Sequence, residues 1–382
     1  MVRISRALVG IGLIVGCVGC QPAATQSTTA GASPRPSPSN AATTTPGRVS
    51  QPQAFALFVK AFYVGASGYQ IQLVGADGKI AASTTARNRS FKKNGLVDLP
   101  VTSTTSTKVY YLDGDSDIRY MTSTGQTGSA YHIAITGDQL ASFAVTPDDL
   151  RIAATVIDYA SEPPTMRLFT DDLAGGHKVE LFSSSRVYEW PVGWHQGHLV
   201  LAVSPLASVQ NAGEWYMGSR GFHIVEAASG NRLLAICEDL SADTPFPTSP
   251  WGGTCQIYPN VANLVSWDGV KREVLVDRCR AIGPPSPDGS RVAVRGMDGG
   301  CATATNAPIR VIDSSGRVNV STALGVPLGW LDNSHLIFQE DLPPFSAANA
   351  VAPIKILELA NASAVVVDAS GFFAGDLPGG LG

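Results

Sequence analysis

Two groups of side chains in this sequence have spacings that could bind a metal ion. The first is Asp113, Asp115 and Asp117, which alternate like the opening carboxylates of a calcium-binding loop. Such a loop requires glycine at its sixth position and glutamate at its twelfth, where this sequence has Ile118 and Thr124. The aspartates are therefore a weak calcium candidate, and a solvated turn is the favoured interpretation.

The second group is the histidine pair His195 and His198, which spans a predicted turn. The sequence identifies no further ligands for this pair, so a structural or solvated role is favoured over metal binding. The chain also lacks a Gly-x-Ser-x-Gly nucleophile motif and a phosphate-binding loop. We therefore assign no catalytic residue, no resident metal and no cofactor from the sequence.

The elements that must carry any site belong to an internal repeat of about 46 residues that occurs seven times. Its best copies are Ser286–Ala293, which reads Ser-Pro-Asp-Gly-Ser-Arg-Val-Ala, and Thr146–Ala153, which reads Thr-Pro-Asp-Asp-Leu-Arg-Ile-Ala. Each repeat contains about four short apolar runs separated by turns, as one propeller blade does. We predict an all-β fold, a seven-bladed β-propeller of about four antiparallel strands per blade, closed by segments near 54–62 and 371–376.

The octet Ser286–Ala293 also resembles the WD40-like repeat of the periplasmic translocation protein TolB and its bacterial relatives. Thr146–Ala153 lacks the glycine of that repeat, and Gly-Trp units at Gly193 and Gly329 replace the Pro-Asp pair. The resemblance therefore implies the propeller fold and transfers no functional residues.

The N-terminal segment is similar to a bacterial lipoprotein signal peptide. Basic residues precede an apolar stretch from Ala7 to Val15, which is too short to span a bilayer, and Gly-Cys-Val-Gly-Cys follows. Small residues before a cysteine resemble a lipobox, which implies that the cysteine carries lipid, such as palmitate, and becomes the mature N-terminus. The residue order favours Cys17, whereas processing at Cys20 leaves an even number of later cysteines, so both stay open.

Composition divides the chain into three parts. Residues 1–20 form the predicted signal peptide and lipobox, residues 21–53 a disordered linker rich in Thr, Ser and Pro, and residues 54–382 the propeller. The net charge of −4 gives no support for nucleic-acid binding, which requires a basic surface. We expect a lipid-anchored protein on the cell membrane, facing the periplasm or the cell exterior.

The four later cysteines are predicted to form disulfides, because the expected compartment is oxidising and no Cys-x-x-Cys spacing indicates a metal site. In the predicted topology Cys237 ends the fourth blade and Cys255 enters the fifth. Cys279 leaves the fifth blade, and Cys301 lies in a loop of the sixth. We therefore pair Cys237 with Cys255 and Cys279 with Cys301.

The loops of the predicted blades differ in length between the two faces of the disc. Turns after the first and third strands are short, whereas several connections after the second strand and between blades are long, and such loops usually mark a binding face. Large aromatic side chains in these connections are candidate ligand contacts, although they could instead fold back over the disc. They are Tyr159, Trp215, Tyr216, Phe246, Trp251 and Phe345.

Two functions follow from these expectations. The favoured one is a membrane-anchored lipoprotein whose propeller is a binding or scaffold module for a protein, peptide or glycan. The alternative is a propeller enzyme, a lyase or glycan hydrolase, with its site at the central channel. Such an enzyme needs converging carboxylate, histidine or arginine side chains. Because the sequence reveals no such cluster, we favour binding.

Overall fold

The computed structural model describes residues 53–61, 68–90, 100–205, 219, 221–238, 249–257, 261–275, 282–295, 308–341 and 352–381. The predicted signal peptide, the lipidation candidates Cys17 and Cys20, and residues 21–52 of the predicted linker lie outside these ranges. Within the described residues the chain forms strands and no helix, as the sequence predicted. Accordingly, no described segment forms a helix long and apolar enough to cross a membrane.

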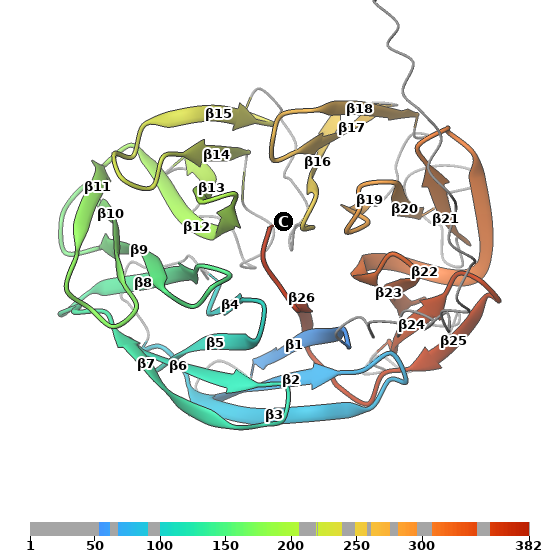
Figure 1. Cartoon of the computed structure of the whole chain (residues 1–382), viewed down its shortest axis with the longest axis horizontal. Coiled ribbons are helices and arrows are strands. Elements are labelled where there is room, and N and C mark those ends of the chain that lie inside the picture. The colour runs from blue at the N-terminus through green and yellow to red at the C-terminus, as the bar shows by residue number, and fades with distance from the viewer. Residues whose placement is uncertain are drawn as a thin grey trace, which may run out of the picture. The chain divides into compact units, whose positions relative to one another are not determined.

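Four sheets contain four antiparallel strands each (Figure 1). The first has the order β26-β1-β2-β3, with β1 Phe55–Ala61, β2 Gly68–Val74, β3 Ile80–Arg87 and β26 Phe372–Leu377. The second contains β4 Thr102–Thr104, β5 Lys108–Asp113, β6 Asp117–Thr122 and β7 Thr127–His132. The third contains β8 Gln139–Val145, β9 Arg151–Asp158, β10 Thr165–Asp172 and β11 Val179–Ser184. The fourth contains β12 Val187–His195, β13 His198–Pro205, β14 Phe222–Val225 and β15 Arg232–Ile236.

Two further sheets complete the ring. One has three strands, β16 Gly252–Ile257, β17 Val261–Ser266 and β18 Lys271–Leu275. The other has seven, β19 Ile282–Pro285, β20 Arg291–Arg295, β21 Pro308–Asp313, β22 Val318–Asp332, β23 His335–Glu340, β24 Ile354–Glu358 and β25 Ser363–Val366. The sheets stand side by side around a central axis, so the fold is a β-propeller of mainly four-stranded units (Figure 1).

The ring is closed by strands from distant parts of the chain, as predicted. β26 pairs with β1, with Phe55 opposite Leu377 and Val59 opposite Phe372. Phe373 is buried and its ring centroid lies 5.9 Å from that of Phe58, whereas Phe372 is 38% exposed. Closure therefore buries one of the two adjacent phenylalanines, because successive side chains of a strand point to opposite faces.

The residues that repeat in the sequence hold neighbouring sheets together. The Thr146 hydroxyl accepts the Arg151 amide (2.9 Å), and the Ser286 hydroxyl likewise accepts the Arg291 amide (3.0 Å). The repeated tryptophans each reach a strand that precedes them in the chain. Trp194 Nε1 donates to the Ala144 carbonyl of β8 in the preceding sheet (3.3 Å), and Trp330 Nε1 donates to the Pro284 carbonyl of β19 within the seven-stranded sheet (3.0 Å). The repeat thus specifies both the turn of each unit and its contact with the next.

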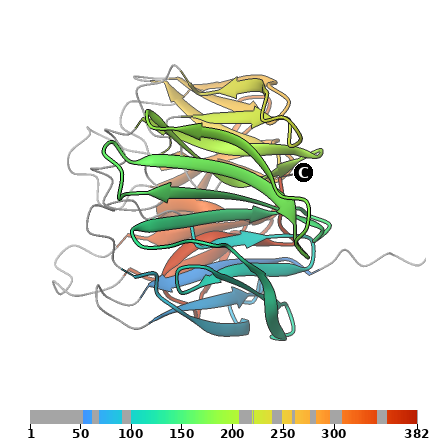
Figure 2. The same ribbon diagram turned by 90° about the vertical axis from the view of Figure 1, so that its left-hand side faces the viewer.

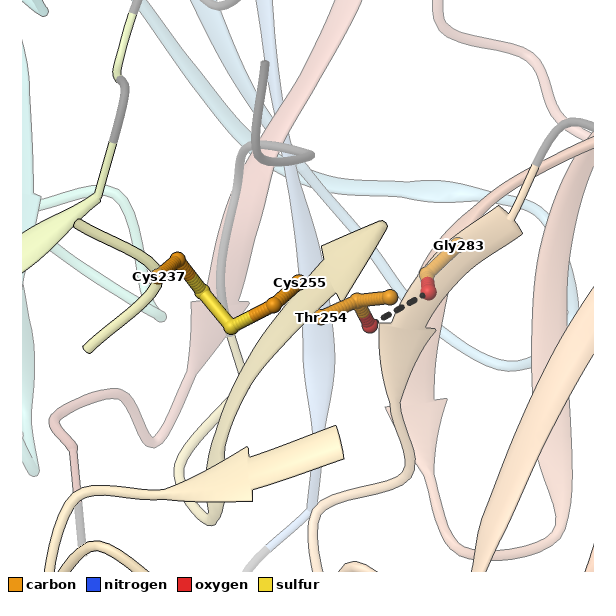
Figure 3. The surroundings of a disulfide bond; sticks show 4 residues. All are labelled: Cys237, Thr254, Cys255 and Gly283. Atoms are coloured by element: carbon orange, nitrogen blue, oxygen red, sulfur yellow. Dashed lines mark hydrogen bonds between the residues drawn. A yellow bond between two sulfur atoms is a disulfide. The ribbon is translucent and has the colours of Figure 1, made fainter. Parts of the chain in front are cut away.

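A disulfide joins Cys237, just after β15, to Cys255 in β16, with the two Cα atoms 5.3 Å apart (Figure 3). This is the first predicted pair. The adjacent Thr254 hydroxyl donates to the Gly283 carbonyl of β19 (3.0 Å), so β16 is tied to the sheets on both sides. The second predicted pair, Cys279 and Cys301, lies outside the described residues.

Candidate functional site

The propeller has two faces that differ in their connections. Turns such as those between β8 and β9 and between β22 and β23 join the first and second strands of their units and are tight, and the face that they share is here called the short-turn face. Figure 2 shows the ring edge-on, with its two faces to the left and right. The opposite face is here called the long-loop face, and the end of β13 at Pro205 and the start of β14 at Phe222 lie on it; residues 206–218 and 220 between them lie outside the described residues. Four of the predicted ligand contacts lie outside the described residues, namely Trp215, Tyr216, Phe246 and Phe345.

The two predicted contacts that are described do not present a free aromatic surface on the long-loop face. Tyr159 is only 5% exposed and belongs to the core that contains Tyr188. Trp251 lies in a turn in which the Ser249 hydroxyl accepts its amide (3.2 Å), and its ring packs on the Gly289 turn. Trp251 is therefore part of the short-turn face, because its turn is equivalent to those that begin at Thr146 and Ser286.

Four ionisable side chains meet on the sheet formed by β12 to β15. His223 of β14 has Nδ1 2.8 Å from Glu189 Oε1 of β12 and Nε2 3.1 Å from Glu238 Oε1. Arg232 Nη1 donates to the same Glu238 oxygen (2.8 Å). His223 and Glu189 are buried, whereas the side chains of Arg232 and Glu238 are 52% and 48% exposed. We call these four residues the charged cluster.

The register of the sheet brings the cluster together. Glu189 is opposite Val203, and His223 is opposite Leu201 on the same central strand β13. Residues two apart on a strand face the same side, so Glu189 and His223 project from the same face of the sheet. β12 is the innermost strand of this sheet, so the cluster begins beside the central channel and extends outward to the half-exposed Arg232 (Figure 1).

The electrostatics of the charged cluster favour a fixed cation flanked by anions. Burial alone lowers the pKa of His223, but its hydrogen bonds to Glu189 and Glu238 outweigh burial, and the pKa is raised. The hydrogen bond from His223 lowers the pKa of Glu238. Both ring nitrogens of His223 are within hydrogen-bonding distance of protein groups, Nδ1 of Glu189 and Nε2 of Glu238 and Arg232. The half-exposed Arg232 and Glu238 are instead suited to hydrogen bonding with a polar partner.

The central channel is narrowed at the short-turn face by the segment that follows β26. Leu381 is buried against Trp194, and a side chain at Gly193 would collide with it, since a Cβ there would lie 2.6 Å from Leu381 Cγ. His195 Nδ1 donates to the Leu381 carbonyl (2.6 Å), and the Gly379 amide donates to the Thr105 carbonyl (2.7 Å). A cavity of about 50 Å³ remains at this mouth.

Asp376 is the charged side chain that lines this small cavity. Burial raises the pKa of its carboxyl from 3.8 to about 7. The other described residues around the cavity are neutral, and they include Thr102, Ser103 and Thr104. A single carboxyl does not form the converging set of charged groups that an enzyme site at this mouth would need.

The aspartates considered for calcium are occupied by protein partners. Arg87 Nε donates to Asp113 Oδ1 (3.0 Å) and its Nη2 to Asp117 Oδ2 (3.1 Å), while the Ser90 amide donates to Asp115 Oδ1 (2.7 Å). His195 faces the 378–381 segment, and His198 is its partner across the β12–β13 turn. Among the described residues no group of three or more His, Cys, Asp or Glu side chains is placed to hold a metal.

The charged cluster was missed in the sequence because its members are far apart along the chain. Glu189 and Glu238 lie 34 and 15 residues from His223. A sequence signal was nevertheless present, since Glu189 and His223 are ionisable residues flanked on both sides by apolar or aromatic residues of their strands. Buried ionisable residues are rare unless they are paired.

No family model matches this sequence, and no curated protein matches it. Similar solved structures include an oligogalacturonate lyase from Vibrio parahaemolyticus, at 9% identity and a TM-score of 0.47, covering 79% of this chain and 90% of that one. Another is an acylaminoacyl peptidase from Pyrococcus horikoshii, at 11% identity and a TM-score of 0.47, covering 82% and 52%. The β-propeller domain of the Trilobed protease from Pyrococcus furiosus has 12% identity and a TM-score of 0.40, covering 70% and 82%. The propeller assignment itself rests on the strand order and pairing described above.

Proposed function

We propose that this chain is an exported lipoprotein whose propeller binds a protein, peptide or glycan through its long-loop face. The observation that carries binding is the charged cluster, in which the side chains of Arg232 and Glu238 are about half exposed beside the buried His223 and Glu189. The opposite channel mouth is filled by Leu381 and its neighbours. A polar rim beside long loops is the usual composition of a recognition surface.

The proposal includes seven blades. The seven-stranded sheet contains enough strands for two units if β22 serves both, with its first half pairing to β21 and its second half to β23. Counted in this way, the six hydrogen-bonded sheets correspond to the seven sequence repeats. The TolB-type resemblance remains part of the same proposal and rests on the Ser286–Ala293 octet.

Export and anchoring rest on the lipobox and are supported by the Cys237–Cys255 disulfide, since such bonds persist in oxidising compartments. Replacing both Cys17 and Cys20 with Ser should release the protein from the membrane. Detergent phase partitioning of the wild type and the double variant tests this. Retention of the double variant in the detergent phase would exclude lipid at these cysteines as the anchor.

Binding is tested with the full-length chain, purified in detergent, on glycan and peptide arrays. We expect a ligand whose signal falls at least tenfold when Arg232 and Glu238 are both replaced by Ala, which removes two charge-assisted contacts. Arg186, between β11 and β12, and Glu180, near the start of β11, provide a control pair of the same two charges outside the cluster. A signal that is unaffected by the cluster variant would contradict the proposed surface.

A propeller lyase or glycan hydrolase is the second candidate, because His223 and Glu189 of the innermost strand β12 converge, with His223 Nδ1 2.8 Å from Glu189 Oε1. This hypothesis requires product formation from a polysaccharide panel. It also requires loss of product formation in His223→Ala with binding retained. Binding without any product across the panel would favour the recognition function.

A further inference from the structure

A cleft of about 370 Å³ opens between the two halves of the seven-stranded sheet. Its lining comes from strands β20 to β22, from the turn after β22 and from the end of β24 with the turn that follows. The lining residues are Arg291, Val311, Asn319, Ser334, Leu357, Leu359, Ala360 and Ala362. The turn residues among them belong to the short-turn face, opposite the charged cluster.

The path of β22 creates this cleft. Its first half pairs with β21 as far as Leu324, and its second half pairs with β23 from Gly325 onward. The chain bends at Gly325, where a Cβ atom would lie 2.1 Å from the Gln339 carbonyl oxygen. The two halves diverge from this bend, so Asn319 and Ser334, near opposite ends of β22, lie on separate walls.

Arg291 supplies the positive charge of the cleft. Its Nη1 donates to the Asn333 carbonyl (2.8 Å), which fixes the guanidinium at the β22–β23 turn. An arginine side chain has five N–H donors, and the remaining donors of Arg291 have no protein acceptor among the described residues. Arg291 is also the only charged residue lining the cleft within the described part of the chain. The site therefore suits a single negative charge.

The rest of the cleft is a mixture of apolar floor and neutral polar edge. Val311 and Leu357 are 2% and 1% exposed and close the bottom, and Leu359 and Ala360 extend the apolar wall. Asn319 and Ser334 add an amide and a hydroxyl at the rim. A volume of this size lies within the usual range for small-molecule sites, which combine apolar walls with a few polar groups.

We propose that this cleft binds a carboxylate carried on a short aliphatic chain. The carboxylate would accept hydrogen bonds from the free donors of Arg291, for which the planar guanidinium is suited. The aliphatic chain would cover Val311 and Leu357. A phosphate monoester carries close to two negative charges at neutral pH, and the described lining contains no second cation besides Arg291 to balance the second charge. A carboxylate, with one negative charge, therefore matches the cleft better than a phosphate. The chemistry is shared by free carboxylic acids and by peptides that end in an aliphatic residue.

The test uses ligand-observed NMR titration of the full-length chain in detergent with three probes, hexanoate, N-acetyl-leucine and the neutral hexanamide. We expect at least one carboxylate to bind ten or more times tighter than hexanamide, an order of magnitude typical of losing a charge-assisted hydrogen bond. Tighter hexanoate points to a free acid, and tighter N-acetyl-leucine to a peptide terminus; either result supports the shared chemistry. Equal binding of all three probes, or no binding, would overturn the proposal.

Variants separate the cleft from the rest of the surface. Arg291→Gln should weaken carboxylate binding about tenfold, whereas Arg317→Gln, an exposed arginine at the β21–β22 turn outside the cleft, should leave it unchanged. Ala360→Phe should fill the cleft without removing Arg291 and should also abolish binding. Equal effects of the two arginine variants, or full binding by Ala360→Phe, would contradict the assignment. The site is on the face opposite the proposed partner surface, so its failure leaves that proposal intact.

Discussion

Replacing Asp376 with Asn should stabilise the protein at neutral and alkaline pH and leave it unchanged in acid. Burial raises the pKa of the Asp376 carboxyl from 3.8 to about 7. At about 1.4 kcal/mol per pH unit this rise corresponds to roughly 4 kcal/mol. The side chain still borders the small channel cavity, so we expect about 2–4 kcal/mol after allowing for partial hydration.

The sign of this effect follows from proton binding. Below the pKa that the Asp376 carboxyl has in the unfolded chain, the carboxyl is neutral in both the folded and the unfolded state. Its burial therefore does not lower the free energy of unfolding at such a pH. Between about pH 4 and 7 the folded state binds more protons, so the free energy of unfolding falls as the pH rises, and above pH 7 the loss is complete. Asp376→Asn removes this dependence.

Urea unfolding followed by tryptophan fluorescence at about pH 4, 6 and 8 measures the difference between the wild type and Asp376→Asn. The control is Asp368→Asn, since Asp368 has a side chain that is 47% exposed and pairs with Lys79. A surface pair of this kind contributes about 1 kcal/mol or less. A difference between Asp376→Asn and wild type that is the same at all three pH values would refute the reasoning.

Three further substitutions probe other parts of the ring. His223→Gln should destabilise the protein most below about pH 6.5, because there the protonated ring of His223 is held by Glu189. The destabilisation should become smaller as the pH rises through the raised pKa of His223. Equal decreases in the free energy of unfolding, measured with urea at about pH 5 and pH 8, would contradict this. Replacing both Cys237 and Cys255 with Ala removes a disulfide between residues 18 positions apart and should lower the free energy of unfolding by about 3 kcal/mol. A variant that has the melting temperature of the oxidised wild type in calorimetry would contradict this. Leu381→Ala should cost at least about 2 kcal/mol, because it removes a buried leucine side chain. A melting temperature equal to that of the wild type would show that the channel segment does not stabilise the ring.

The repeat pattern predicted those parts of the fold that depend on local chemistry. Turn residues such as Thr146 and Ser286 recur at a whole number of repeat lengths, and apolar strand-opening residues recur between them, so the all-β propeller and the closing pair β1 and β26 could be predicted without coordinates. Trp251 was placed on the wrong face because its Ser249-Pro250 turn was taken as part of a long connection. The residues of a turn indicate on which face of the propeller the turn lies only after the repeat that contains it has been aligned correctly with the other repeats.

The sites were less predictable because they depend on register and on chain paths between sheets. Glu189 and His223 meet because they pair with Val203 and Leu201, two residues of β13 whose side chains point to the same face of the sheet. This strand register cannot be read from the local sequence around either residue. The cleft at Arg291 depends on β22 continuing from one unit into the next, whereas the repeat indicates two separate strands. The channel segment at Leu381 has no periodicity and becomes apparent only through its packing on Trp194.

The pairing of β1 with β26 has a consequence for how the protein is made. Synthesis proceeds from the N-terminus, so β1 emerges early, and its hydrogen-bonding edge toward the central axis remains open until Phe372–Leu377 have been added. Contacts between such distant segments form slowly, and an unpaired strand edge is prone to aggregation in the interval. A chaperone would therefore have most to protect in the first sheet, and a stop codon upstream of Phe372 should produce an aggregating chain rather than a smaller propeller.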